Sequence, residues 1–283
     1  MRIAILITVY NRKEKTIACL NNITNLDDIN NHDLDIYIVD GGSSDGTPQA
    51  IKTMFPDVNL YIEEGLFWAG GMRKAWKETI SSNKIYDLYW LVNDDTFLYK
   101  HALHEGITSH EYSISEFMKG GVYVESTISP SKNRISYGGR KLKKWGYNKA
   151  NKLIPNGEYQ LCELGNANSM FVSRDVFEAI GGLSSLYTHG IADYDYTLRT
   201  VQAGFPCFIT PTFCGECEDD HGKNWKSSST NLSERIKYLY SPKGLAYKEY
   251  LQYIKLFFPK EYYSSVVKLW AKTLCPQIWD YFK

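Results

Sequence analysis

Apolar runs alternate with amphipathic stretches along the first hundred residues. The apolar run at 3–9 predicts a buried strand, and the mixed stretch at 13–23 predicts a helix after it. The pattern continues with expected strands at 35–39, 59–62 and 88–92 and expected helices at 45–54 and 70–80. This alternation predicts a mainly parallel sheet covered on both faces, in which ligands bind beyond the carboxyl ends of the strands.

The pattern changes twice along the rest of the chain. Strand-like pieces at 121–125, 135–137 and 169–172 surround a basic stretch at 140–144, and expected helices at 174–180 and 193–203 precede a strand at 207–209. From about residue 231 the pattern is helical and basic, with 9 Lys+Arg against 4 Asp+Glu. We therefore expect a separate helical unit at the end of the chain.

Composition narrows the class of protein. Lysine plus arginine and aspartate plus glutamate both number 32, and hydrophobic residues make up 43%, which excludes a disordered or fibrous chain. A neutral balance also argues against binding nucleic acid through phosphate contacts alone. The N-terminal apolar run is too short to span a bilayer and is not followed by a cleavage-site pattern, so we expect a cytoplasmic protein whose six cysteines are reduced.

Polar motifs follow three of the expected strands. Thr8-Val-Tyr-Asn11 follows the first, and Asp40-Gly-Gly-Ser follows the second, where a carboxylate can accept hydrogen bonds from a base or ribose. An ordinary Gly/Ser/Asp turn explains that second motif equally well. Asn93-Asp94-Asp95 follows the fourth strand and suits Mg²⁺ or Mn²⁺ carrying a diphosphate. A helix N-cap is the alternative, but it explains two adjacent acids poorly.

Five motifs in order carry a family resemblance. The set TVYN (8–11), VDGGSSDGT (39–47), GGMRKA (70–75), LVNDD (91–95) and ADYDYTLR (192–199) resembles the inverting family 2 glycosyltransferases of GT-A fold, from Met1 to about His221. The resemblance implies an α/β fold with a single Rossmann-like, mainly parallel sheet flanked by helices. It also implies a glycosyltransferase domain at 1–230, with a nucleotide-binding half (1–100) and an acceptor-binding half (101–230), and a helical C-terminal extension at 231–283.

The resemblance assigns the donor site to the strand ends. Asp40, with Thr8 and Tyr10 nearby, would hold the nucleotide base, and Arg73 would approach the nucleotide end of the donor. Asn93-Asp94-Asp95 occupies the place of the family's Asp-x-Asp motif. Asp95 would be the metal ligand and Asp94 would face the donor sugar or ribose, whereas Asn93 departs from the motif and serves through its amide or not at all.

The later motifs imply the base and a further metal ligand. Asp193 matches the family's general base, although Ala192 replaces the preceding Glu. For Asp195 and Arg199, four residues apart on one expected helix, we favour a structural role as a surface salt bridge. His221 matches a late histidine that some members place on the metal, and a structural or solvated histidine is the equal alternative. Cys214-x-x-Cys217 beside it would suit zinc only with a fourth ligand.

The function implied by the resemblance is sugar transfer that depends on Mn²⁺ or Mg²⁺. A UDP- or dTDP-sugar would donate to a hydroxyl of a glycan or lipid-linked saccharide, in surface polysaccharide biosynthesis. Segment 68–73 resembles rhamnosyl- and galactofuranosyl-transferring relatives, which favours dTDP-rhamnose. The alternatives are a non-catalytic nucleotide-sugar-binding relative and a nucleotidyltransferase, whose first loop is usually rich in Gly and basic residues. A dinucleotide oxidoreductase needs Gly-x-Gly-x-x-Gly where Tyr10-Asn-Arg-Lys stands.

The C-terminal helices have two interpretations. Lysines alternate with 13 aromatic residues from Tyr238 onward, a pattern that favours anionic head groups and the interfacial depth of a membrane. Contact with the inner face of the plasma membrane would place the enzyme beside a lipid-linked acceptor. Packing of the aromatic faces on the rest of the chain or on a second subunit is the interpretation we favour. Pro259 is expected to divide the segment into two helices.

Overall fold

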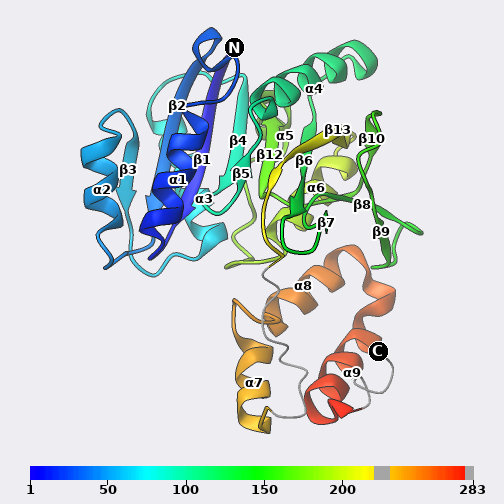
Figure 1. The fold of residues 1–283 in the computed structure, drawn as a ribbon. Helices are drawn as coiled ribbons and strands as arrows, with labels where there is room; N and C mark the ends of the chain where they lie inside the picture. The colour runs from blue at the N-terminus through cyan, green and yellow to red at the C-terminus, as the bar shows by residue number, and fades with distance from the viewer. Residues whose placement is uncertain (220–229, 278–283) are drawn as a thin grey trace.

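The computed structural model describes residues 1–219 and 230–277, and Figure 1 shows its ribbon. The first part alternates strands and helices as predicted: β1 (Arg2–Val9), α1 (Lys13–Ile23), the 3₁₀ turn η1 (Ile29–Asn31), β2 (Asp33–Asp40), α2 (Thr47–Met54), β3 (Asn59–Ile62), α3 (Trp68–Ser81) and β4 (Leu88–Asn93). The middle adds β5 (Phe97–Leu98), α4 (Ala102–Phe117), β6 (Val122–Ser129), β7 (Arg134–Ile135), β8 (Gly139–Leu142), β9 (Ala150–Lys152), β10 (Gln160–Leu161), β11 (Leu164–Gly165), β12 (Ser169–Ser173), α5 (Arg174–Ile180), α6 (Ala192–Gln202) and β13 (Cys207–Glu216).

A 10-stranded sheet forms the centre, with the order β10-β13-β6-β12-β4-β1-β2-β3 and with β5 and β7 beside β13 and β6. Strands β4, β1, β2 and β3 are parallel, which confirms the predicted α/β sheet. The second half is mixed, because β12 runs antiparallel to both β4 and β6. A separate three-stranded sheet, β11-β8-β9, contains the basic stretch.

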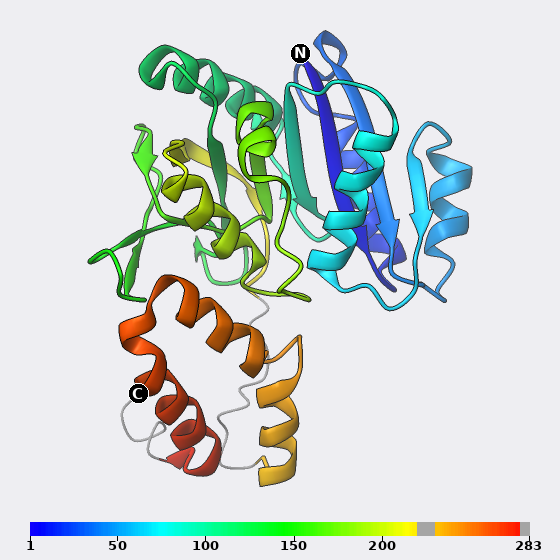
Figure 2. The same cartoon turned by 180° about the vertical axis from the view of Figure 1, so that it is seen from behind.

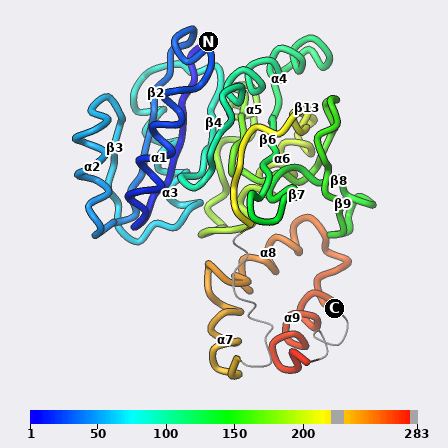
Figure 3. The backbone as a smooth tube through the Cα atoms, viewed as in Figure 1, coloured from blue at the N-terminus to red at the C-terminus, as the bar shows by residue number. Residues whose placement is uncertain are grey.

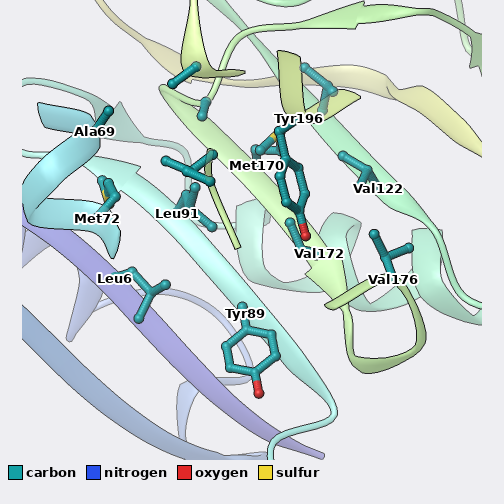
Figure 4. Close-up of a cluster of buried hydrophobic side chains, with 14 of the residues drawn as sticks. Leu6, Ala69, Met72, Tyr89, Leu91, Val122, Met170, Val172, Val176 and Tyr196 are labelled. Carbon is teal, nitrogen blue, oxygen red and sulfur yellow. The ribbon is translucent and has the colours of Figure 1, made fainter. Parts of the chain in front are cut away.

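Helices cover both faces of the sheet. Helices α1, α2 and α4 lie on the face seen in Figure 1, and α3, α5 and α6 lie on the face seen in Figure 2. Figure 4 shows Leu6, Leu91 and Met170 from neighbouring strands packed with Met72 of α3 and Tyr196 of α6. Burial on both faces explains why the run at 3–9 is continuously apolar rather than alternating.

The C-terminal extension consists of α7 (Leu232–Tyr240), α8 (Tyr247–Phe257), the 3₁₀ turn η2 (Pro259–Glu261) and α9 (Tyr262–Leu274). Pro259 stands between α8 and α9, as predicted, but α7 precedes them, so the described part of the extension has three helices where two were expected. Strand β1 runs from the N-terminus toward this extension, so the carboxyl ends of the parallel strands face it (Figures 1 and 3). No helix in the described part of the chain is long and apolar enough to cross a bilayer.

The extension packs on the rest of the chain through α8. Tyr253, Ile254 and Phe258 belong to the same buried cluster as Tyr187 and Tyr196, whereas Leu239, Leu251 and Leu269 form a small core between the three helices. Part of the aromatic surplus is therefore buried, in agreement with the packing interpretation. Tyr263 and Val267 on α9 remain exposed, at 82% and 66%.

Candidate active site

Strands β1, β2 and β4 end side by side at one edge of the sheet. Val9 lies opposite Asp40 of β2, and Thr8 lies opposite Asn93 of β4. The residues that follow parallel neighbours meet at the same edge. The structure thus brings together three of the predicted motifs, which are 30 to 80 residues apart in the chain.

Asp40 is fully buried at the end of β2. Its Oδ1 accepts hydrogen bonds from the backbone N–H groups of Gly42 (2.8 Å) and Ser43 (2.6 Å). The turn requires a glycine at position 42, where φ is +95°. Oδ2 is also buried but has no hydrogen-bond partner in the structure. A buried carboxylate oxygen without a donor is costly, so this atom is suited to a donor supplied by a ligand.

Thr8, near the end of β1, and Tyr10, just after it, lie beside the Asp40 turn. Thr8 lies against α3, because a Cβ added to Gly71 would stand 2.4 Å from its Cγ2. Its hydroxyl donates to the carbonyl oxygen of Trp68 at 3.4 Å. Tyr10 is 49% exposed, and its ring edge lies 3.5 Å from the position a Cβ of Gly41 would take. The Tyr10 ring is therefore an accessible aromatic surface beside the Asp40 turn, suited to a flat ligand.

The acidic motif after β4 is bound by an arginine that the sequence analysis did not select. Arg12 Nη1 lies 3.0 Å from Asp94 Oδ1 and 2.8 Å from Asp95 Oδ2. Thr16 on α1 donates to Asp94 Oδ2 at 3.3 Å. Arg12 directly follows the Thr8–Asn11 motif at the end of β1. This position beside a strand end is the sequence signal that could have indicated its role.

The two aspartates differ in environment. Asp94 is buried, and burial raises its pKa to about 6 against the opposing charge of Arg12. Asp95 has a side chain 18% exposed and is the more accessible carboxylate. Asn93 does not face outward, because its Oδ1 accepts a hydrogen bond from Trp68 Nε1 at 2.8 Å. Its amide therefore holds the start of α3 against β4.

The carboxylate of Asp95 fits a divalent ion whose remaining coordination positions are filled by phosphate oxygens of a ligand. Mg²⁺ and Mn²⁺ sites commonly use one or two protein carboxylates, with phosphate oxygens and water supplying the rest. Asp95 offers such a carboxylate, with the Cys217 thiol 3.9 Å from its Oδ1. Within residues 1–219 and 230–277, no group of three or more His, Cys, Asp or Glu side chains is placed to hold a metal. His221 lies outside the described residues.

Asp193 lies in the first turn of α6, after Ile191 with φ of +71°. Its Oδ2 accepts a hydrogen bond from Asn166 Nδ2 at 3.2 Å, and its Oδ1 accepts one from the Tyr194 N–H at 2.8 Å. Burial raises the pKa of the Asp193 carboxyl despite these hydrogen bonds. A fixed carboxylate with a raised pKa is a better proton acceptor than an exposed one.

Asp195 and Arg199 form the expected ion pair, but the expected surface position is wrong. Arg199 Nε lies 2.7 Å from Asp195 Oδ2, and the Asp195 side chain is only 2% exposed. Arg199 also donates to the carbonyl oxygens of Ile180 and Gly182, both at 3.0 Å. The pair is thus buried rather than at the surface, and it ties α6 to the segment after α5.

Arg73 on α3 holds the loop that precedes α6. Its Nη1 donates to the carbonyl oxygens of Ser184 and Tyr187, both at 2.9 Å. The extension holds the same loop, because Glu249 of α8 accepts hydrogen bonds from the N–H (2.9 Å) and the hydroxyl of Thr188. The contacts of Arg73 in the structure are therefore with this loop rather than with the Asp40 turn.

The extension also reaches the strand ends. Lys243, between α7 and α8, lies 5.8 Å from the centre of the Tyr10 ring. His189, in the loop held by Arg73, has a pKa lowered by burial and further by the charges of Lys243 and Arg12. Lys243 and Arg12 are therefore close enough to His189 to disfavour its charged form. Arg12, His189 and Lys243 are far apart in the sequence, so no local sequence pattern could have predicted that they lie together.

Comparisons with known proteins agree with this arrangement. A family model described as "Glycosyl transferase family 2" matches residues 4–179. A mannosyltransferase from Pyrobaculum calidifontis in complex with GDP-mannose and Mn²⁺ is similar, with a TM-score of 0.53 and 15% identity over 83% of this chain and 64% of that one. TarS of S. aureus in complex with UDP-GlcNAc has a TM-score of 0.54 and 13% identity over 84% of this chain.

The match covers 64% of the TarS chain as well, so this chain spans less than two thirds of the length of either structure. At these identities the likeness shows a common fold, the GT-A fold that the motifs predict. No curated protein matches the chain.

Proposed function

The chain belongs to glycosyl transferase family 2, and from this premise we propose that it moves a sugar from a UDP- or dTDP-sugar to a hydroxyl of a glycan or lipid-linked saccharide. The observation that carries the proposal is the unpartnered buried Oδ2 of Asp40 at the end of β2, across β1 from the accessible carboxylate of Asp95 after β4. Uracil and thymine both present an N–H that can donate a hydrogen bond to this oxygen. Tyr10 would cover the base, with Thr8 beside it.

The metal site of the proposal consists of Asp95, with His221 as a further ligand. A bound Mn²⁺ or Mg²⁺ supplies charge neutralisation for the leaving nucleoside diphosphate. Arg12 pairs with both Asp94 and Asp95 in the structure, so its guanidinium must release Asp95 before that carboxylate can serve as a ligand. Asp94, which stays buried, would then keep Arg12 at the edge of the site, facing the donor.

The proposed reaction is a one-step inverting displacement. Asp193 accepts the proton of the acceptor hydroxyl as its oxygen attacks the anomeric carbon. The bond from that carbon to the diphosphate oxygen breaks, and the diphosphate leaves from the opposite face with the electron pair. Asn166 holds the Asp193 carboxylate in position. Arg73 and Glu249 are positioning residues, because they hold the loop that leads into α6 and so orient Asp193 indirectly.

The test is a panel of UDP-, dTDP- and GDP-sugars titrated into the full chain with and without Mn²⁺. The free oxygen of Asp40 can accept a hydrogen bond from a single N–H, so UDP or dTDP compounds should bind more tightly than GDP compounds. The substitution Asp40→Asn should weaken the binding of UDP and dTDP compounds. Asp57→Asn, in the exposed turn between α2 and β3, is the matched control. The proposal fails if no nucleotide-sugar binds, or if binding occurs without metal-dependent turnover of any member.

Membrane contact through the extension is a further part of the proposal. The support is the exposed apolar surface of α9, which carries Tyr263 and Val267 close to Lys260 and Lys268. Apolar and aromatic side chains beside lysines suit an anionic membrane surface. Such contact would bring the enzyme to a lipid-linked acceptor on the inner face of the plasma membrane.

A further inference from the structure

A cationic cavity of about 530 Å³ lies between the small sheet and helix α6. Three of its lining side chains are basic, Arg140 of β8 and Lys143 and Lys149 of the β8–β9 connection, and Tyr194 of α6 lines it as well. The N–H of Lys143 donates to the carbonyl oxygen of Lys149 at 2.8 Å, so the hairpin brings the two lysines together. The basic stretch of the sequence thus has a defined place in the fold.

The cavity adjoins the proposed general base. Tyr194 follows Asp193 directly in α6. Burial raises the pKa of the Tyr194 hydroxyl, the charge of Asp193 raises it further and that of Arg140 lowers it. The phenol is therefore close to both the carboxylate and the guanidinium. Strands β8 and β9 lie at the opposite end of the central sheet from β2 and β3 in Figure 1, so the cavity is far from the Asp40 turn along the sheet.

The basic side chains of the cavity are not neutralised by ion pairs. Among the described residues, Arg140, Lys143 and Lys149 form no ion pair with a carboxylate within 4.0 Å. The nearby Glu163 is bound to Lys141 at 2.7 Å. The Arg140 Nε is buried and has no hydrogen-bond partner in the structure. A buried donor without an acceptor is unfavourable, and it would be satisfied by an anion in the cavity.

The loop that carries the lysines is held in place by the extension. Asn148 donates its backbone N–H to Glu261 and its side-chain amide to the Tyr250 hydroxyl, both at 3.3 Å. These contacts fix the hairpin before any ligand arrives, which lowers the entropic cost of binding. They also engage Glu261, so this carboxylate is directed at the backbone of Asn148.

We infer that this cavity binds an anionic group, phosphate or carboxylate, carried by the saccharide acceptor, and that the enzyme selects acidic over neutral acceptors. The inference rests on the proposed function, because it is the place beside Asp193 that makes the cavity an acceptor subsite. Arg140 would donate from its buried Nε, and Lys143 and Lys149 would supply charge. The acceptor hydroxyl would then lie between the anionic group and the donor.

A binding experiment tests the cavity without sugar transfer. Inorganic phosphate and glucuronate, each at constant ionic strength, are titrated into the full chain by calorimetry, with glucose as the neutral probe. At least one of the anions should bind more tightly than glucose, and Arg140→Ala and Lys149→Ala should each weaken it about 10-fold, as expected for one charge-assisted hydrogen bond. Lys52→Ala, an exposed lysine on α2, is the matched control and should leave binding unchanged.

The outcomes separate this inference from the proposed function. The anion-binding subsite is refuted if glucose binds as tightly as the two anions. It is also refuted if Arg12→Ala weakens anion binding and Arg140→Ala does not. In the transfer assay, Arg140→Ala should raise the KM for phosphorylated or uronic-acid acceptors about 10-fold while the affinity for UDP is kept. An active enzyme that uses neutral and acidic acceptors equally refutes only this inference. An enzyme that binds no nucleotide-sugar refutes the proposed function itself.

Discussion

Glu125→Gln should change how the stability of the protein depends on pH. Glu125 lies on β6 with no solvent exposure. Its Oε2 accepts a hydrogen bond from the Ser169 hydroxyl, whose oxygen in turn accepts one from Trp90 Nε1 at 2.9 Å. Burial raises the pKa of the Glu125 carboxyl from 4.5 to about 8, with the Ser169 hydrogen bond opposing it. The carboxyl is therefore neutral in the folded protein at pH 7.

The sign follows from the proton count. Between pH 5.5 and 7.5 the folded state keeps the Glu125 proton and the unfolded chain has lost it, so raising the pH favours unfolding. One proton of difference changes the free energy of unfolding by about 1.4 kcal/mol per pH unit, or about 3 kcal/mol over this range. The loss levels off above about pH 8, where the folded carboxyl ionises too. Gln carries no titrating proton and can still accept from Ser169.

Urea unfolding followed by tryptophan fluorescence at pH 5.5, 6.5 and 7.5 measures the effect. From pH 5.5 to pH 7.5, the free energy of unfolding of the Gln variant should rise by about 3 kcal/mol relative to that of the wild type. Other titrating groups, including Asp94, contribute equally to the unfolding free energy of both proteins, so their contributions cancel in the difference. Glu116→Gln, an exposed change on α4, should leave the wild-type slope unaltered. If the difference between wild type and Glu125→Gln is constant with pH, the folded carboxyl is not neutral and the reasoning is refuted.

Two further predictions concern the proposed site, and a third concerns the C-terminal extension. Asp95→Ala should abolish the gain in UDP affinity that Mn²⁺ produces in calorimetry, because the ion loses its carboxylate; an undiminished gain would place the metal elsewhere. Asp193→Asn should bind donor normally but lose transfer at least about 100-fold, and an intact single-turnover rate would exclude it as the base. The full chain should sediment with phosphatidylglycerol vesicles at low salt, and less so after Tyr263→Ser; protein that stays in the supernatant at low salt contradicts membrane contact.

The sequence predicts the nucleotide half well because local signals agree there. Continuous apolar runs define β1 to β4, and polar residues at strand ends meet once the strands are parallel. Helix α4 is not predicted, since Gly106 and the residues after it, Ile107 to Ser109, have low helix propensity. Packing overrides propensity, because a Cβ on Gly106 would stand 2.1 Å from the ring of Phe171.

The site is less predictable than the fold because several contacts join distant segments. Asp40 and Asp95 follow strands and can be selected from their position. Asp40 is bound by its own turn, but other contacts of the site are set by tertiary packing: Arg12 bridges to Asp94 across 82 residues, and Glu249 accepts from Thr188 across 61. No periodicity or motif spacing encodes such pairs. The antiparallel course of β12 is of the same kind, because strand direction depends on the connection and not on the strand's composition.

The contact of Glu249 with Thr188 means that the end of the chain cannot be treated as a removable appendage. The loop at 182–191 is held from one side by Arg73 and from the other by α8, and it leads directly into the turn that carries Asp193. A shortened chain ending near residue 230 would lose one of these two supports together with Lys243. Swapping C-terminal helices between relatives would thus change the support of the Asp193 turn and the surroundings of Tyr10 in one step.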